Sequence, residues 1–277
     1  MTDTTLHAAA PEQLLATYHS RREESVVQPK GNLALVNTQW IDSEQSIWGV
    51  PGRWAPNRDG GLLVTADATA GIVVDGTLVD GSAIVRGKDD PNPSEIIFSE
   101  TVTGFVIAGD DGTYALRVWD SSSESIQEFG SIDSFAYDPN WVITAKFTEN
   151  PAGTTLGFEH LKDDGKTKHQ VIPGEITFTK DGTDYNLAAF KSGRALELVF
   201  ADATNGVDTY SVGRFLFVAP NRDGSIVLDF NRAVLPPCAF SYNFNCPLPP
   251  KQNRFAVPIT AGEKNVLKKD GSLLHEM

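Results

Sequence analysis

The stretch RFLFVAPNRDGSIVLDFN, residues 214–231, decides the fold class of this chain. Two runs of largely apolar residues, Arg214–Val218 and Ile226–Phe230, stand on either side of the letters Ala-Pro-Asn-Arg-Asp-Gly. Tight turns select Pro, Asn, Asp and Gly, and short runs rich in β-branched and aromatic residues are typical of strands. The stretch therefore predicts strand, turn and strand, paired so that Val218 lies opposite Ser225.

The same rhythm of short strands and turns recurs along the whole chain. Eight aspartates stand directly before a glycine, a dipeptide favoured where both residues adopt positive φ in a hairpin turn. They are Asp59, Asp75, Asp80, Asp111, Asp164, Asp181, Asp223 and Asp270. Further strand-like runs are Gly71–Asp75, Gly104–Ala108, Tyr114–Trp119, Trp141–Phe147 and Leu196–Phe200. We expect an all-β protein, a sandwich or barrel of about a dozen or more short strands.

One helix is expected, at the N-terminus. Pro11 suits a first helical position, and Pro29 with Gly31 ends the helix. Four residues fall near one face of it: Leu14, Leu15, Tyr18 and Val26. The acids Glu23 and Glu24 directly follow Arg21 and Arg22, so we interpret this amphipathic helix as packing on the protein rather than on a membrane surface.

The composition suggests four segments. Residues 1–30 hold the helix, residues 31–150 an N-terminal β lobe, residues 151–264 a C-terminal β lobe, and residues 265–277 a solvated tail. The break between the lobes is placed in the Pro- and Gly-containing stretch Thr148–Gly157. The two lobes are also compatible with one continuous domain.

The charge balance limits the classes of partner. The chain has 23 basic and 36 acidic residues, a net charge of −13, and 40% hydrophobic residues. Binding of nucleic acid or anionic lipid needs clustered Lys and Arg, so neither nucleic acid nor membrane is expected as a partner. No run of about 20 apolar residues and no signal peptide is evident, which predicts a soluble, cytoplasmic protein. The five histidines are scattered, so no metal site is expected.

Polar residues cluster in the predicted strands of the C-terminal lobe. Reading Arg194–Asp202 and Thr209–Val218 as strands turns Asp202 and Arg214 inward, and the predicted pairing places Arg214 opposite Asp229. The proposed cluster comprises Asp202, Tyr210, Arg214, Asp229 and Asn231. Two interpretations stay open. The cluster is either a binding site with an anion-holding arginine, or a buried Arg–Asp bridge that fixes strand register.

The only cysteines, Cys238 and Cys246, stand eight residues apart in a proline-rich loop. In an oxidising compartment they would form a local disulfide, and in the cytoplasm they would be two thiols or a redox pair. Nucleophilic catalysis by Cys238 is disfavoured because no histidine lies nearby in the sequence. We expect this loop, with Asn253 and Arg254 just beyond it, to form a lid or wall beside the polar cluster.

Several motifs carry a family resemblance. They are Phe200–Gly206, Gly213–Leu216, Leu228–Ala233, Pro236–Phe240, Cys246–Pro250, Asn253-Arg254 and Ala261–Lys264, with looser agreement at Gly31–Leu35, Tyr114–Asp120 and Asn140-Trp141. With these motifs the chain resembles the domain of unknown function 1684 family of prokaryotic proteins, from roughly Tyr18 to Lys264. The chain departs from that pattern at Asn32, where the family has Trp, and at Leu235, where it has Asn. The resemblance supports the segmentation and implies no particular reaction.

Three functional hypotheses follow. The first is a binding protein that holds a small polar or anionic ligand through Arg214, Asn231, Asn253 and Arg254. The second is a hydrolase in which Asp202 or Asp229 is a general acid or base, with Tyr210 beside it. The third is a flavin-binding β-barrel, in which Arg214, Thr204 and Thr209 would hold the flavin phosphate.

Overall fold

The computed structural model describes residues 10–163 and 165–275. The chain divides into two compact units. The barrel unit comprises Met1–Glu23, Phe129–Phe240 and Asn245–Met277, and the two-sheet unit comprises Glu24–Glu128 and Ser241–Phe244. The main chain passes between the units after Glu23, Glu128, Phe240 and Phe244. The stretch Thr148–Gly157, where the sequence suggested a break, lies inside the barrel unit, between two of its strands.

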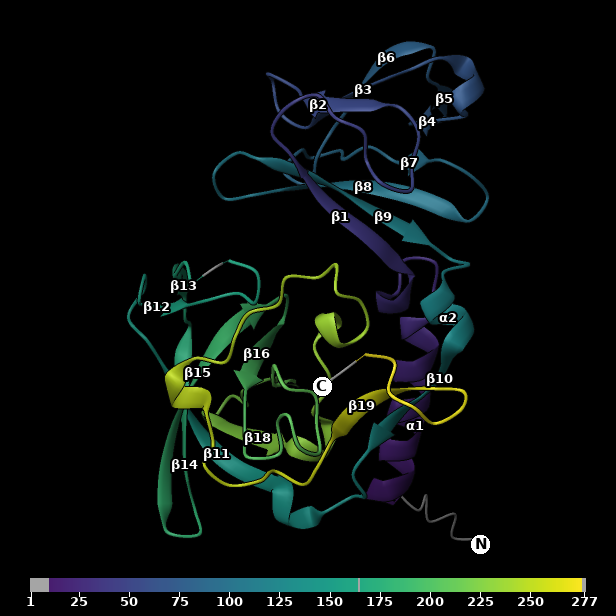
Figure 1. Cartoon of the computed structure of the whole chain (residues 1–277). Helices are drawn as coiled ribbons and strands as arrows, with labels where there is room; N and C mark the ends of the chain where they lie inside the picture. The colour runs from purple at the N-terminus through teal and green to yellow at the C-terminus, as the bar shows by residue number, and fades with distance from the viewer. Residues whose placement is uncertain (1–9, 164, 276–277) are drawn as a thin grey trace, which may run out of the picture. The chain divides into compact units, whose positions relative to one another are not determined.

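A six-stranded antiparallel sheet in the order β17-β16-β15-β14-β11-β18 forms the barrel unit's centre (Figure 1). Its strands are β11 (Val142–Glu149), β14 (Gly174–Lys180), β15 (Thr183–Ser192), β16 (Ala195–Phe200), β17 (Arg214–Val218) and β18 (Ser225–Asp229). The end strands β17 and β18 approach each other, so the sheet nearly closes. Two small sheets complete the unit: β10 (Phe129–Ser134) with β19 (Glu263–Lys268), and β12 (Thr155–Phe158) with β13 (Lys168–Val171).

The predicted hairpin between β17 and β18 is wrong. β17 pairs with β16, with Arg214 opposite Phe200, and β18 pairs with β11, with Asp229 opposite Val142. The other edge of β17 is occupied elsewhere, because the N–H of Phe215 donates to the Val234 carbonyl and the N–H of Val234 donates back. The turn residues between the strands therefore carry the chain from one end of the sheet to the other.

Two further segments differ from the sequence-based expectation. β17 begins at Arg214 rather than Thr209, because Gly213 has a φ of 115° and lies against the backbone of Phe200, where a Cβ atom would clash. The expected solvated tail from residue 265 instead begins inside β19, which pairs with β10 and buries Val266. Val266 is the buried apolar residue through which this segment packs on the protein. The lysine-rich composition of the segment did not indicate that burial.

Helix α1 (Pro11–Val26), most of which belongs to the barrel unit, begins as predicted at Pro11. Of the four residues expected on one face, Leu15 and Tyr18 are half-buried and Val26 is fully buried, whereas Leu14 is 60% exposed. The buried and half-buried residues are Leu15, Tyr18, His19, Arg22, Glu23 and Val26. Their i, i+3, i+4 spacing marks one helix face, so α1 packs through a stripe that is mostly polar.

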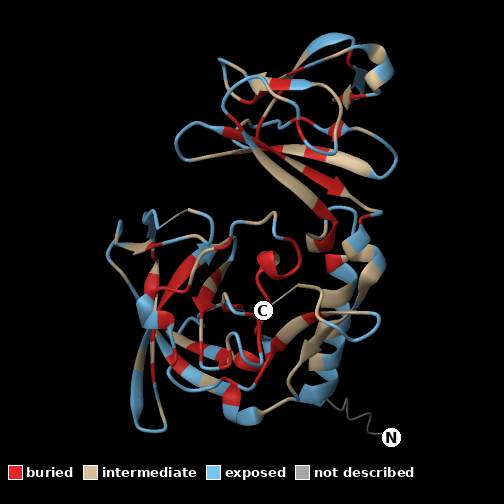
Figure 2. Cartoon of the chain, viewed as in Figure 1, coloured by how far each residue is buried: buried red, intermediate tan, exposed pale blue. Residues whose placement is uncertain are grey.

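Many residues of the barrel unit's strands are buried (Figure 2). Their aromatic and aliphatic side chains form the core of the unit. The ring centroid of Phe200 lies 5.3 Å from that of Phe230, and that of Phe230 lies 5.8 Å from that of Phe255, both edge to face. This geometry is favoured for aromatic pairs. In β16, Leu198, Val199 and Phe200 are all buried.

The two-sheet unit is also built from strands. One sheet has the order β1-β9-β8-β7-β4-β5 and the other β2-β3-β6. The strands are β1 (Leu35–Ile41), β2 (Arg53–Pro56), β3 (Leu62–Ala66), β4 (Val73–Val74), β5 (Thr77–Leu78), β6 (Gly81–Val85), β7 (Ile96–Ile97), β8 (Val102–Ala108) and β9 (Tyr114–Asp120); α2 (Glu124–Glu128) follows. Trp54 is fully buried in their shared core. The expected all-β class with an N-terminal helix is confirmed.

The Asp-Gly pairs adopt two kinds of turn. Asp75 and Asp181 have positive φ together with the glycine that follows, as the hairpin prediction requires. In Asp223-Gly224-Ser225, only the glycine has positive φ, and the aspartate Oδ1 accepts hydrogen bonds from the N–H and hydroxyl of Ser225; residues 111–113 and 270–272 adopt the same arrangement. Asp164 lies outside the described residues.

Candidate functional site

The guanidinium of Arg214 forms a buried ion pair with Asp202. Its Nη2 lies 2.7 Å from Asp202 Oδ2, and both side chains are fully buried. Arg214 also donates to the carbonyls of Ile259, Ala261 and Glu263, and burial lowers the pKa of this arginine while Asp202 opposes the shift. The second carboxylate oxygen of Asp202 accepts hydrogen bonds from the backbone N–H groups of Thr204 and Ile259. This geometry matches the structural interpretation: the pair joins the start of β17 to the chain before β19.

The predicted pairing of Arg214 with Asp229 is therefore wrong, because the two lie on strands that pair with different neighbours. Asp229 ends β18, and its Oδ1 accepts from the N–H and the side-chain amide of Asn231. The Asn231 amide also donates to the carbonyl of Asp138 and accepts from the Asp138 N–H. Asn231 thus fixes the connection between β10 and β11 rather than joining the Arg214 pair.

The five other candidates make contacts within the protein. Tyr210 Oη donates to the Cys238 carbonyl at 3.2 Å. Asn253 is fully buried, and its amide bonds with the backbone of Ala188 and Val199, which ties β15 to β16. Arg254 is exposed, and its Nε donates to the Pro249 carbonyl. The hydroxyls of Thr204 and Thr209, considered for a flavin phosphate, are buried and bonded to each other.

A second buried ion pair anchors α1. Arg22 Nε lies 3.1 Å from Oε1 of Glu263, whose side chain is 1% exposed. The Leu235 N–H donates to the other carboxylate oxygen, and Arg22 Nη2 donates to the Leu235 carbonyl. Burial raises the pKa of Glu263, and Arg22 partly offsets that effect. α1 is thus attached to the barrel through a charged pair in a low-dielectric setting.

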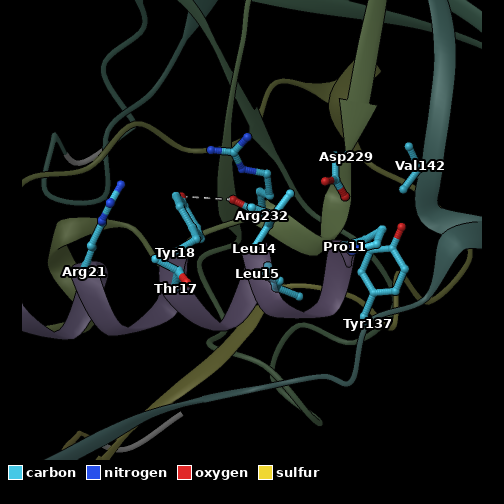
Figure 3. Close-up of a pocket in the computed structure, with 10 residues that line it drawn as sticks. All are labelled: Pro11, Leu14, Leu15, Thr17, Tyr18, Arg21, Tyr137, Val142, Asp229 and Arg232. Atoms are coloured by element: carbon cyan, nitrogen blue, oxygen red, sulfur yellow. Dashed lines mark hydrogen bonds between the residues drawn. The ribbon is translucent and has the colours of Figure 1, made fainter. Parts of the chain in front are cut away.

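An open pocket lies beside this anchor (Figure 3). Its volume is about 440 Å³, within the range typical of small-molecule sites. One wall is the α1 face, and the other comes from β11, the end of β18 and the turn after it. The lining residues are Pro11, Leu14, Leu15, Thr17, Tyr18, Arg21, Tyr137, Val142, Asp229 and Arg232.

The pocket combines apolar surface with cationic groups. Leu14 and Val142 are 60% and 38% exposed. The guanidinium of Arg232 lies 4.8 Å from the ring centroid of Tyr18, whose hydroxyl donates to the Arg232 carbonyl. Burial raises the pKa of Tyr18, and Glu263 adds to the shift. Arg21 and Arg232 point into the same space, and Asp229 is the acidic group opposite them (Figure 3).

Comparison with known proteins places the barrel unit in a family. The family described as "Protein of unknown function (DUF1684)" matches residues 127–264. The chain belongs to this family. A solution NMR structure of an uncharacterized protein from Haloarcula marismortui shares 34% sequence identity with this DUF1684 protein over 49% of this chain and 77% of that one, with a TM-score of 0.40. No curated protein matches the chain.

The DUF1684 match covers only part of the pocket. Tyr137, Val142, Asp229 and Arg232 lie inside residues 127–264, whereas the α1 residues of the pocket lie outside them. Of the looser agreement in the sequence, Gly31–Leu35 and Tyr114–Asp120 fall outside the match, whereas Asn140-Trp141 falls inside it. At Leu235, where the chain departs from the DUF1684 pattern, the backbone groups hold Arg22 and Glu263, so the contact does not depend on that side chain.

Sequence reasoning missed Arg22, Glu263, Arg21 and Arg232. A signal existed for Arg22, because it lies on the stripe that begins at Leu15, Tyr18 and His19. Glu263 follows Gly262, which has a φ of 82° and leaves no room for a Cβ atom against Phe230 and Ala233. The long-range pairing of the two residues has no sequence signal.

The described part of the chain holds neither a metal-binding cluster nor a membrane-spanning helix. Among residues 10–163 and 165–275, no cluster of three or more His, Cys, Asp or Glu side chains is arranged to hold a metal ion. Over that same part of the chain, no helix is both long and apolar enough to cross a membrane.

Proposed function

We propose that the barrel unit is a binding module for a small amphipathic anion and that the ligand occupies the pocket beside α1. The observation that carries this proposal is the pairing of exposed apolar side chains, Leu14 and Val142, with two arginines around one cavity of about 440 Å³. An arginine guanidinium recognises a carboxylate or phosphate with two parallel hydrogen bonds. The exposed leucine and valine would cover an apolar body of a few carbons.

This proposal moves the expected ligand from the Arg214 cluster to the pocket. Arg214 is fully buried, and its partners are Asp202 and three backbone carbonyls, so an anion there would compete with bonds already formed. Arg232 and Arg21 are exposed and line open space. Asp229 lies in the same pocket and would disfavour a second negative charge at that end, so a monoanion suits the site better than a dianion.

Titration of the whole chain with hexanoate, followed by calorimetry or by amide chemical shifts, tests the proposal. We expect saturable binding that 1-hexanol, the uncharged analogue, does not reproduce. Arg232→Gln should weaken hexanoate binding about tenfold or more, the loss of one charge-assisted contact. Arg222→Gln, an exposed arginine in the β17–β18 loop, is the matched control and should bind as the wild type does. Equal affinity in both variants, or weakening by Arg254→Gln alone, would refute the pocket assignment.

A further inference from the structure

The proline-rich loop brings the chain's only two cysteines together. The N–H of Cys238 lies 3.2 Å from the sulfur of Cys246, and the two thiols are in hydrogen-bonding contact. Cys238 is fully buried and Cys246 is 3% exposed, and both are in the free thiol form. Seven residues of chain lie between them, so their contact is a property of how this loop folds.

Neighbouring elements hold both ends of the loop in this position. The Cys238 carbonyl accepts from Tyr210 Oη, and the Cys246 carbonyl accepts from the N–H of Leu161. Prolines flank each cysteine, at positions 236 and 237 and at 247, 249 and 250, and they restrict the backbone further. The thiols therefore stay in contact without a covalent bond.

The two sulfurs have different surroundings. The Cys246 thiol lowers the pKa of Cys238, and Tyr210 and Lys162 act in the same direction, although burial opposes them. The pKa of Cys246 is raised, first by its hydrogen bond with Cys238 and then by burial and by Glu197. A thiolate is the reactive form of cysteine, so Cys238 is the more nucleophilic member of the pair.

We propose that Cys238 and Cys246 form a peroxide-oxidisable dithiol site that converts reversibly to an intramolecular disulfide. The Cys238 thiolate attacks one oxygen of hydrogen peroxide, the O–O bond breaks, and a sulfenic acid and hydroxide form. The Cys246 sulfur then attacks the sulfenic sulfur, the S–S bond forms, the S–O bond breaks, and the thiol proton leaves with the hydroxyl as water. In total, two thiols and one peroxide give one disulfide and two waters.

Peroxide suits the burial of this site better than a thiol or a protein disulfide does. Hydrogen peroxide is only slightly larger than water, whereas exchange with glutathione or a partner protein needs a sulfur exposed to a bulky reagent. The closed loop would also have a topological effect. Ser241–Phe244, which lie between the cysteines, belong to the two-sheet unit, so the disulfide would join the two ends of the segment that leaves the barrel unit.

The test begins with the reduced full-length protein and a small molar excess of hydrogen peroxide. Intact mass should fall by two hydrogens, denatured protein should lose both alkylatable thiols, and dithiothreitol should restore them. Retention of both thiols would overturn the proposal, as would conversion to a disulfide-linked dimer or to sulfinic acid instead of the internal disulfide. This measurement does not involve the α1 pocket, so its result is independent of the hexanoate experiment.

Single variants test the order of the steps. In Cys246→Ser, Cys238 has no thiol partner, and dimedone should label its sulfenic acid. In Cys238→Ser, burial and Glu197 still raise the pKa of Cys246 although Cys238 no longer contributes, so dimedone should label Cys246 less than it labels Cys238 in Cys246→Ser, by roughly tenfold per pKa unit. Tyr210→Phe should slow labelling of Cys238 without changing the final disulfide. Equal labelling of both single variants would contradict the assigned roles, and if either fails to fold, the mass change of the wild type decides the proposal.

Discussion

At the scale of single residues, the Arg214–Asp202 pair is expected to contribute strongly to the stability of the barrel unit. Both side chains are fully buried, and removal of one partner leaves an uncompensated buried charge. Arg214→Met should therefore lower the free energy of unfolding by about 3–5 kcal/mol, measured by urea denaturation at neutral pH. Arg222→Met, at an exposed position in the β17–β18 loop, should change it by no more than about 0.5 kcal/mol.

A double-mutant cycle shows whether the loss comes from the pair itself. Asp202→Asn keeps an oxygen acceptor for the N–H groups of Thr204 and Ile259 while it removes the charge. Arg214→Met with Asp202→Asn should cost less than the sum of the single changes, because the double variant buries no unpaired charge. Additive losses would indicate that Arg214 acts through its carbonyl contacts instead.

The same pair shows what the sequence reveals at this scale. Alternation along the strands correctly turns Asp202 and Arg214 inward, since the side-chain period of a strand is two. The choice of Asp229 as partner was wrong because it depended on β17 and β18 forming a hairpin. Local pattern determines which face a residue occupies, whereas its partner depends on long-range strand order, which the turn residues do not specify.

At the scale of elements, α1 should make stability depend on pH through Glu263. Burial raises the pKa of Glu263 above its unfolded value, so folding favours proton uptake between the two pKa values. The corresponding stabilisation is fully present below the unfolded pKa, about 4.3, and is lost as pH rises through the folded pKa. Glu263→Gln should remove this loss, which amounts to at most about 1.4 kcal/mol per pH unit for one proton.

Unfolding curves recorded from mildly acidic to neutral pH measure this difference directly. Gln at position 263 keeps an oxygen for the Leu235 N–H, so the hydrogen bond is retained while the titration is removed. Glu12→Gln, at an exposed position on the first turn of α1, is the control and should follow the wild-type slope. Parallel curves for Glu263→Gln and the wild type would contradict the assigned pKa direction.

The helix also shows where element-level prediction succeeds and fails. Pro11 correctly marked its start, because proline suits a position whose N–H needs no partner. Its packing face was predicted correctly at Leu15, Tyr18 and Val26 and wrongly at Leu14, which is exposed. The polar members of the same face, His19, Arg22 and Glu23, give no hydrophobic signal, and the contact of Arg22 with Glu263 lies far along the chain.

At the scale of the whole molecule, each unit should respond separately to damage in its own core. One apolar cluster consists only of residues 141–261 in the barrel unit, and another only of residues 41–118 in the two-sheet unit. Ile176→Ala and Leu116→Ala each remove a fully buried side chain, one from each cluster, at a cost of about 2–5 kcal/mol. Hydrogen exchange with mass spectrometry should show lost protection in the mutated unit alone.

The location of the family match and of the pocket predicts which of these two variants should lose ligand binding. Residues 127–264 correspond closely to the main segment of the barrel unit, and every residue that lines the α1 pocket belongs to that unit. Leu116→Ala should therefore leave hexanoate affinity unchanged while exchange rises across residues 24–128. Ile176→Ala, which damages the barrel core, should weaken binding once the barrel unit begins to open. Loss of affinity in Leu116→Ala together with intact barrel protection would mean that the two-sheet unit contributes to the ligand site, against the assignment of binding to the barrel unit alone.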